Sequence, residues 1–491
     1  MVDAPTESTA RPTRREQLHA LLVAFVCAIV YLGPSLLPGR SLVPYPPEYH
    51  EPRMSEALEA GMSVAEIGRG NLSMGDKYNQ SLMWDRVIEQ RFRAGEFPLW
   101  TRDIGGGAPF VPQMGQPYEP WNLLLFVWSS TEWYGPVVLL QLVLIGWFAY
   151  RFFRRVDCRH VSSLFGIVVV LLGLWMQGRI HQNVVISAAL PLFFMLSCIH
   201  DMFGGKRILR AIGVFAIGAG LTWSAGFAPV SLQITYLCIA FGITLAIVRR
   251  RVRPLVFVGL GLALGAVVAL AQMIPVLLAA AESAREQPTA DHLARLGADF
   301  ANLLSMLWPD LLFWPDPGAM SGGNSLMSLL WLDALLPQPG VPLPDLNYTE
   351  MVFSTGLVST IGIAGLIGRG AAVRERAPFL ILFALVVVLG LGLASGTSPF
   401  LELSAAIPGA RAGDLRRFLF AVYVGMAILS TFGVDRIVRS GRSTSPRVIA
   451  AIAAIGSLVL LWFASGTEEQ LTTRFAERLV DRYGAFAELT I

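Results

Sequence analysis

Charged residues are scarce in this sequence, and their scarcity limits what the protein can be. Only 15% of the 491 residues are charged, while 54% are hydrophobic. A soluble protein carries about 25% charged residues. The composition therefore excludes a chain that lies mainly in water and predicts one that lies mainly in lipid, where charge is costly. The net charge of +3 is small and is not gathered into one patch, so no nucleic-acid partner is predicted.

Sequence motifs of several common active sites are also absent. The four cysteines form no CxxC or CxxH spacing, which leaves a zinc site and a disulfide framework without support. No Walker A, GxSxG or HExxH motif occurs, so nucleotide-driven transport and common hydrolase chemistry lack support. No DxD pair occurs, and Asp310 and Asp316 stand among apolar residues as turn carboxylates. A divalent cation thus has no sequence support, and we predict neither a metal site nor a cofactor.

The sequence contains a series of long uncharged segments. The first, 18–38, follows three arginines and resembles a signal sequence. Its length and the many segments after it predict an uncleaved anchor that forms the first helix. Ten more segments are long enough, or nearly so, to cross about 30 Å of hydrocarbon. We therefore predict an all-α polytopic membrane protein with about 11 transmembrane helices. The ten segments are 134–150, 161–178, 183–199, 210–225, 228–248, 254–281, 351–368, 378–394, 418–434 and 448–465.

The placement of arginine and lysine predicts the orientation of these helices. Every second connection is basic, and the connections between them carry little positive charge, which is the pattern that puts basic loops in the cytoplasm. The N-terminal tail 1–17 is then cytoplasmic and the transmembrane domain is 18–465. The large loops 39–120 and 283–350 and the short C-terminal tail 466–491 lie outside. The basic connections are Arg151–Arg159, Lys206–Arg210, Arg249–Arg253, Arg369–Arg376 and Arg436–Arg447.

The first large loop is predicted to rest on the membrane. Its segment 79–94 places Leu82, Met83, Val87 and Phe92 on one broad side of a helix, with its charged residues elsewhere. Such a helix would lie in the membrane interface. Aromatic and proline residues continue through the rest of the loop to residue 121, which is typical of chain at the level of the lipid headgroups.

A series of short motifs in order along the chain resembles a known family. The motifs are Gly75-Asp76 with Gln80, GEFPLW at 95–100, the glycine run 105–107, His181 with ALPLFF at 189–194, Gln272-Met-Ile-Pro275, and Pro408-Gly409 followed by Arg416-Arg417-Phe418. They resemble the YfhO-type bacterial membrane proteins of the GT-C class, glycosyltransferases that use polyprenyl-phosphate sugars. Relatives in that family commonly continue into further helices and an outer C-terminal domain, whereas the last span predicted here ends at 465.

The resemblance implies a GT-C-like fold in the bacterial inner membrane and a transfer at its outer face. The donor would be a polyprenyl-phosphate-linked sugar, and the acceptor an extracytoplasmic glycan, lipid or wall polymer. Asp76 matches the acidic residue of the first loop and would be the general base that takes the acceptor proton. A helix cap is the other role open to Asp76. Asp103 and Glu119 are secondary candidates, each with a surface or turn role as the alternative.

Basic and polar residues predicted outside supply candidates for binding the donor. Arg411, Arg416 and Arg417 depart from the positive-inside pattern just before a late helix, and guanidinium groups are good phosphate receptors. Their alternative role is contact with lipid headgroups. Arg179 and His181 lie in a tight outer turn, where His181 either binds phosphate or sugar or is an ordinary turn residue. Gln80 completes the set through its place beside Asp76.

Two other functions remain open at this level. A transporter or flippase of lipid-linked saccharides would place ionisable groups inside the bilayer, and the predicted spans are almost free of charge. A non-catalytic assembly partner would keep the scaffold alone. The distribution of charge therefore favours the enzyme.

Overall fold

The computed structural model describes most of the chain up to residue 282 and two later stretches. The described residues are 12–282, apart from 39, 51, 64–66, 68–73, 103–105, 114–115, 131 and 206, then 289, 293–294, 297, 355–366 and 371–440. The predicted span 448–465, the tail 466–491, Asp103, Asp310, Asp316 and nearly all of the loop 283–350 lie outside them.

The described part is predominantly helical, and seven of its helices are long and apolar enough to cross a membrane. The protein is therefore membrane-embedded. In lipid the helix satisfies every backbone N–H and C=O within one segment. The seven segments are Arg14–Leu36, Tyr134–Arg155, Asn183–Phe203, Ala228–Arg249, Arg253–Ala279, Arg376–Ser395 and Leu415–Arg439, with shorter apolar helices at His160–Leu172 and Ile208–Ser224.

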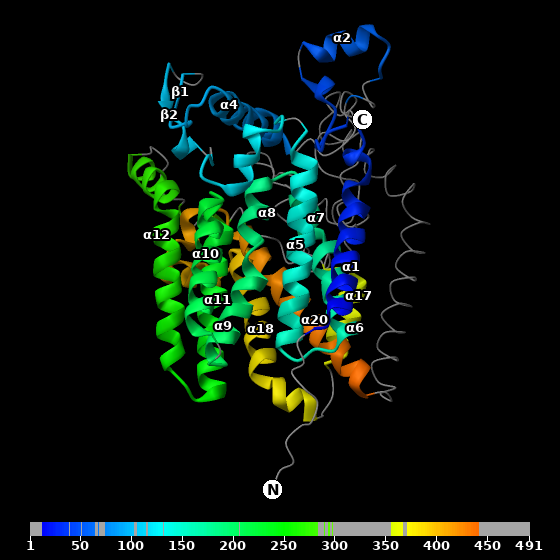
Figure 1. Cartoon of the computed structure of the whole chain (residues 1–491), viewed down its shortest axis with the longest axis vertical. Coiled ribbons are helices and arrows are strands. Elements are labelled where there is room, and N and C mark those ends of the chain that lie inside the picture. The colour runs from blue at the N-terminus through cyan, green and yellow to red at the C-terminus, as the bar shows by residue number, and fades with distance from the viewer. Residues whose placement is uncertain are drawn as a thin grey trace, which may run out of the picture.

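The helices run side by side in one bundle, and the smaller elements of the first loop lie at one end of it (Figure 1). The bundle helices are α1 (Arg14–Leu32), α5 (Tyr134–Arg155), α6 (His160–Leu172), α7 (Leu174–Arg179), α8 (Asn183–Ala189), α9 (Leu192–Phe203), α10 (Ile208–Ser224), α11 (Ala228–Arg249), α12 (Arg253–Glu282), α17 (Leu357–Ala364), α18 (Ala371–Ser395), α19 (Phe400–Ala406) and α20 (Leu419–Ser440). The loop elements are α2 (Arg53–Glu59), the π-helix η4 (Lys77–Ser81), α4 (Leu82–Arg93), β1 (Trp100–Thr101), β2 (Ala108–Pro109) and η6 (Pro120–Phe126).

One predicted segment is broken in the middle for a local physical reason. The segment 161–178 divides into α6 and α7 at Gly173, whose backbone is extended. A Cβ atom at Gly173 would lie 2.4 Å from the ring of Tyr423 on α20. The hydroxyl of Tyr423 donates to the carbonyl of Val170 in the last turn of α6. The break therefore brings a buried tyrosine of a distant helix against the backbone.

Helices α10 and α12 pack closely against each other, and small residues make this possible. A Cβ atom at Gly265 of α12 would lie 2.4 Å from Cβ of Ala219, and one at Gly220 of α10 would lie 2.6 Å from Val268. Small residues at a helix interface let two helix backbones approach closely, which gives membrane helices van der Waals contact with each other.

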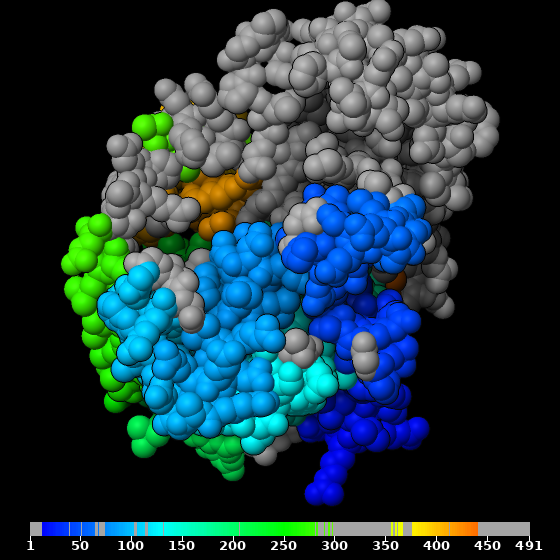
Figure 2. Space-filling model, turned by 90° about the horizontal axis from the view of Figure 1, so that it is seen from above, coloured from blue at the N-terminus to red at the C-terminus, as the bar shows by residue number. Residues whose placement is uncertain are grey.

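The first loop folds onto the end of the bundle. Its antiparallel β1–β2 pair joins Trp100 with Pro109, and Figure 2 looks onto this end, where the blue and light-blue loop residues cover it. The predicted amphipathic helix is present as α4. From its predicted apolar side, Phe92 is buried and Val87 is partly buried against the core, while Met83 is 56% exposed. Asp85 and Ile88 are buried as well. The helix packs against η6, with Phe92 stacked on Phe126 at 4.0 Å between ring centroids.

The close approach of α10 and α12 predicts that Gly265→Leu is destabilising. A side chain at 265 must push the helices apart, and such overpacking costs about 1–3 kcal/mol. Thermal unfolding in detergent, followed by reaction of the four buried cysteines with a fluorogenic thiol dye, measures the change. Gly259→Leu is the matched control, because a Cβ atom there has nothing within 4 Å. Equal melting temperatures for the two variants would contradict the packing account.

Candidate functional site

A group of buried titratable side chains lies where the first loop meets the bundle. It consists of Lys77, Asp85, Glu119, Tyr134 and His181, which we call the loop–bundle cluster. Lys77, Asp85 and Glu119 are only 1%, 9% and 3% exposed. Lysine and acidic residues are almost never buried to this degree unless they are paired or functional. The cluster is therefore the strongest candidate site in the described part of the chain.

Lys77 connects the loop to the bundle. The π-helix η4 carries Lys77, and its Nζ atom lies 3.0 Å from the centroid of the Tyr134 ring at the start of α5. The hydroxyl of Tyr134 donates to the carbonyl of Ile180 at 3.0 Å. A cation over an aromatic ring is stabilised by the negative face of that ring, and more so away from water. Lys77 of the loop thus contacts Tyr134 of α5, whose hydroxyl in turn binds the turn between α7 and α8.

Lys77 and Asp85 influence each other across this site. Burial lowers the pKa of Lys77, and the charge of Asp85 opposes that shift. Burial likewise raises the pKa of Asp85, and the charge of Lys77 opposes it. A buried charge on either residue is costly alone and costs less when the other residue carries the opposite charge. The protonation of Lys77 and that of Asp85 therefore depend on each other.

Glu119 lies just before η6, and one oxygen of its carboxyl group forms no hydrogen bond to the described residues. Its Oε2 atom is buried and has no hydrogen-bond partner among the described residues. Burial raises the pKa of Glu119 to about 8, with opposition from the Ser187 hydroxyl. Asp85 adds to the rise, since a nearby negative charge disfavours a second one. The carboxyl group of Glu119 is therefore largely protonated at pH 7, and it can gain or lose a proton at a pH close to 7.

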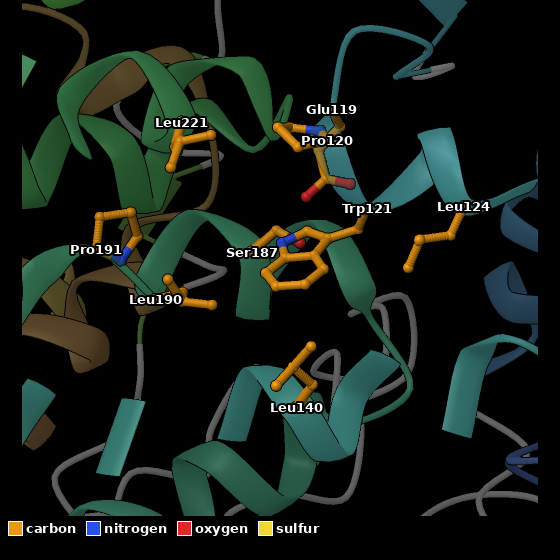
Figure 3. A pocket seen from close by; sticks show the side chains of 9 residues that line it. All are labelled: Glu119, Pro120, Trp121, Leu124, Leu140, Ser187, Leu190, Pro191 and Leu221. Atoms are coloured by element: carbon orange, nitrogen blue, oxygen red, sulfur yellow. The ribbon is translucent and has the colours of Figure 1, made fainter. Parts of the chain in front are cut away.

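The carboxyl group of Glu119 points into a cavity of about 260 Å³ (Figure 3). The polar side chains in its wall are Glu119 and Ser187, and Leu140 in the wall is 47% exposed on the outside of the bundle. The cavity therefore extends from the carboxyl group of Glu119 towards the lipid-facing surface of the bundle. Its full lining is Glu119, Pro120, Trp121, Leu124, Leu140, Ser187, Leu190, Pro191 and Leu221.

A hydrogen-bonded pair fixes the Ser187 side of the cavity. The side-chain amide of Gln141 on α5 donates to Oγ of Ser187 at 2.8 Å, and both residues are buried. Ser187 in turn lies 3.4 Å from Oδ1 of Asn183, one turn earlier on α8. A buried serine held by two polar neighbours keeps its orientation, so the polar end of the cavity is preorganised.

The structure encloses the two outer-turn candidates. Burial lowers the pKa of His181 to about 3, and the charge of Lys77 adds to this. His181 is therefore neutral at pH 7, and any contact with phosphate or sugar would be a hydrogen bond without ionic attraction. Its Nδ1 atom is buried and has no hydrogen-bond partner among the described residues. Arg179 is 2% exposed and donates to Oε1 of Gln182 at 2.8 Å.

Asp76 lies outside the cluster. It is exposed, while its neighbour Lys77 is buried. Its Oδ1 atom accepts from Nε2 of Gln80 at 3.3 Å. The alternative role as a helix cap is not found either, since its side chain makes no capping hydrogen bond. Asp76 and Gln80 form a surface pair.

The three late arginines are engaged by other protein groups, Arg411 and Arg416 within their own segment and Arg417 by a residue between α10 and α11. Arg416 is 2% exposed, and its Nε atom donates to Oδ2 of Asp414 at 2.8 Å. Arg411 donates to Oγ of Ser404 at 2.9 Å. Arg417 lies over the ring of Phe227 at 5.3 Å. Neither these arginines nor Asp76 line the Glu119 cavity, so that cavity does not bring the predicted base and phosphate ligands together.

Sequence reasoning missed Lys77 and Asp85, and it gave Glu119 too small a role. Glu119 is buried, so its alternative role as a surface carboxylate is wrong, although it does lie in a turn, where its backbone N–H donates to the carbonyl of Gln116. The signal for Asp85 is its spacing from Ile88 and Phe92, which places it in the buried stripe of α4. Lys77 carries no comparable signal. Within the described residues, no group of three or more histidine, cysteine, aspartate or glutamate side chains is placed to hold a metal ion.

The raised pKa of Glu119 predicts how stability changes with pH. Between its unfolded value of about 4.5 and about 8, the folded state holds a proton that the unfolded state has lost, so stability falls as pH rises through this window. Glu119→Gln removes that loss. We expect the variant to be more stable than the wild type at pH 9, on the order of 2 kcal/mol, with little difference at pH 4.5.

Thermal unfolding across this pH range provides the measurement. Glu132→Gln is the control, because it removes an exposed carboxylate just before α5 and is expected to change little. A Glu119→Gln curve parallel to that of the wild type at every pH contradicts the burial of an ionisable group here.

No family model matches the chain, and neither does any curated protein or solved structure. The site is therefore interpreted from its own residues and from the sequence motifs that run through it.

Proposed function

We propose that this protein is a membrane glycosyltransferase that moves a sugar from a polyprenyl-phosphate donor to an acceptor outside the cytoplasm. The observation that carries the proposal is the buried Glu119 carboxyl group, directed into a largely apolar cavity beside the lipid-facing surface. The ordered motifs that resemble YfhO-type proteins supply the substrate class. The same proposal includes a GT-C-like fold with about 11 spans and a cytoplasmic N-terminus.

The cavity suits a substrate that is part lipid and part polar. Apolar side chains such as Trp121 and Leu140 offer contact to an isoprenoid chain, while Glu119 and Ser187 offer polar contact to the sugar. Ligand sites in proteins commonly combine an apolar wall with few fixed polar groups. A volume of about 260 Å³ holds only the part of such a donor next to the reacting carbon.

The chemistry assigned to the site is a single displacement. The acceptor oxygen forms a bond to the anomeric carbon, the bond from that carbon to the phosphate oxygen breaks, and polyprenyl phosphate leaves. Glu119 in its ionised form takes the acceptor proton and later releases it to water. A pKa of about 8 lies near the working pH, where general acid–base catalysis is most effective.

Lys77 does not itself line the Glu119 cavity, and it is the cation assigned to act on the leaving phosphate through its electric field. It is the positively charged member of the loop–bundle cluster, and its charge acts on Asp85 and His181. A buried ammonium group stabilises developing negative charge more strongly than an exposed one, because little water screens it. Arg416, the ligand expected from the sequence, already pairs with Asp414 at 2.5 Å.

Transport is the weaker proposal. The buried carboxylate Asp435 of α20 lies near the opposite end of the bundle, where it pairs with Arg376 at 2.9 Å and with Arg439 at 2.6 Å. A carboxylate held by two arginines is stabilised in its charged form and suits a structural role. A proton- or ion-coupled carrier needs a group that changes its charge within the bilayer.

We expect Glu119→Gln to lower turnover by about 100-fold or more, because the amide keeps the shape and cannot take a proton. Membrane vesicles that hold the protein are supplied with a panel of polyprenyl-phosphate hexoses, and release of polyprenyl phosphate is measured. The wild-type rate should pass through a maximum between about pH 7 and about pH 8, because Lys77 loses its charge near its pKa of about 7 while Glu119 ionises near its pKa of about 8.

Asp76→Asn is the matched variant in the same loop, and we expect it to stay within a few-fold of the wild type. Loss of activity in Asp76→Asn with none in Glu119→Gln would move the base to Asp76. No release of polyprenyl phosphate by the wild type from any donor in the panel would remove the enzymatic proposal.

The proposed orientation is tested by two added cysteines at opposite ends of the bundle. The four native cysteines are buried, so their background labelling is low. Ala94→Cys at the end of α4 should react with an impermeant thiol reagent in intact cells, and Leu209→Cys, at a position that is 86% exposed, only after permeabilisation. The reverse pattern would invert the topology.

A further inference from the structure

A second crevice lies between two turns at the end of the bundle away from the first loop. One turn joins α9 to α10 and the other joins α11 to α12. The crevice has a volume of about 470 Å³, and apolar side chains form most of its wall. We call it the basic crevice because two arginines line it. The lining is Met202, Phe203, Gly205, Ile208, Arg251, Val252, Arg253, Pro254 and Phe257.

The two turns present five exposed arginines around the crevice. None of the five forms an ion pair with a carboxylate among the described residues. Arg207 and Arg250 also have a left-handed backbone, with φ of 51° and 50°, which is uncommon for bulky residues. The five are Arg207, Arg210, Arg250, Arg251 and Arg253.

The nearest carboxylate and imidazole do not neutralise this charge. Asp201 at the end of α9 is already bound by Nε of Arg155 at 3.0 Å. Nε2 of His200 lies 2.8 Å from Arg249. The groups that face the crevice from α9 and α11 are thus engaged elsewhere, and its rim keeps a positive charge.

Exposed apolar residues alternate with the arginines and continue along α12. Leu209 is 86% exposed and Val252 is 74% exposed, each next to an arginine in the sequence. From the crevice, Val256 and Leu260 on α12 extend the apolar surface at 68% and 47% exposure. The surface therefore offers positive charge at its end and an apolar path along a membrane-spanning helix.

We propose that the basic crevice binds an anionic phospholipid. The phosphate lies on Arg251 and Arg253, and the acyl chains follow the exposed apolar residues of α12. The two chemical halves of such a lipid match the two halves of the surface, and basic pockets between membrane helices are suited to anionic headgroups. This proposal does not depend on the glycosyltransferase assignment, because the site lies at the other end of the bundle.

The test compares lipids of different charge on the purified full chain. Tetraoleoyl cardiolipin and dioleoylphosphatidylcholine are titrated in detergent, and bound lipid is counted by native mass spectrometry. We expect cardiolipin to bind in preference to phosphatidylcholine, and high salt to reduce its binding. Arg251→Gln/Arg253→Gln should weaken cardiolipin binding by about 30-fold, as two arginines near a lipid headgroup are lost.

Arg14→Gln/Arg15→Gln is the matched control. It removes the same charge from exposed residues of α1, whose Glu16 pairs with Arg154 at this end of the bundle, and should retain cardiolipin binding. Melting temperatures without lipid confirm that both variants fold. The proposal is overturned if both double variants lose cardiolipin binding equally, or if the wild type binds phosphatidylcholine as well as cardiolipin. It is also overturned if inorganic phosphate raises the melting temperature of the wild type as much as cardiolipin does.

Discussion

The contact between Lys77 and Tyr134 is the constraint on which the candidate site depends. Removing an ammonium group from water costs several kcal/mol, and an aromatic face returns about 2 kcal/mol of it. The charge of Asp85 offsets part of the remainder. Each of these residues comes from a different element, so the balance is reached only when η4, α4 and α5 are packed together. That packing closes the loop over the bundle and excludes water from Glu119.

The protein uses its few charges differently at its two ends. Beneath the first loop Lys77, Asp85 and Glu119 are buried, and at Glu119 burial favours the neutral acid. At the other end the charges are paired in clusters, as in Asp435 with Arg376 and Arg439, or exposed around the basic crevice. Paired charges hold helices together with little response to pH, whereas an unpaired buried acid responds strongly. A proton-transfer function therefore fits the loop end, and attachment to a charged lipid surface fits the opposite end.

The sequence predicted the candidate site only in part. It placed a catalytic carboxylate in the first loop and preferred Asp76, on the strength of motif position. The structure exposes Asp76 and buries Glu119. Asp76 and Lys77 are neighbours at the start of the π-helix η4, where successive side chains point in different directions, so their positions in the sequence do not indicate which of them is buried. For Arg416 the partner Asp414 stands two residues away, and the sequence contained that pair without indicating that it would form.

The sequence by itself determined the class of protein and the place of most helices. Long uncharged segments have one stable backbone arrangement in lipid, because the helix satisfies their hydrogen bonds within each segment. That local requirement can be read from composition alone. The tertiary structure decided which face of α4 is buried, where Gly173 interrupts a helix, and that Glu119 opens into a cavity. Some of these outcomes depend on residues more than a hundred positions apart, as with Tyr423 and Val170. Burial by distant partners also raises the pKa of Glu119, which no local sequence pattern encodes.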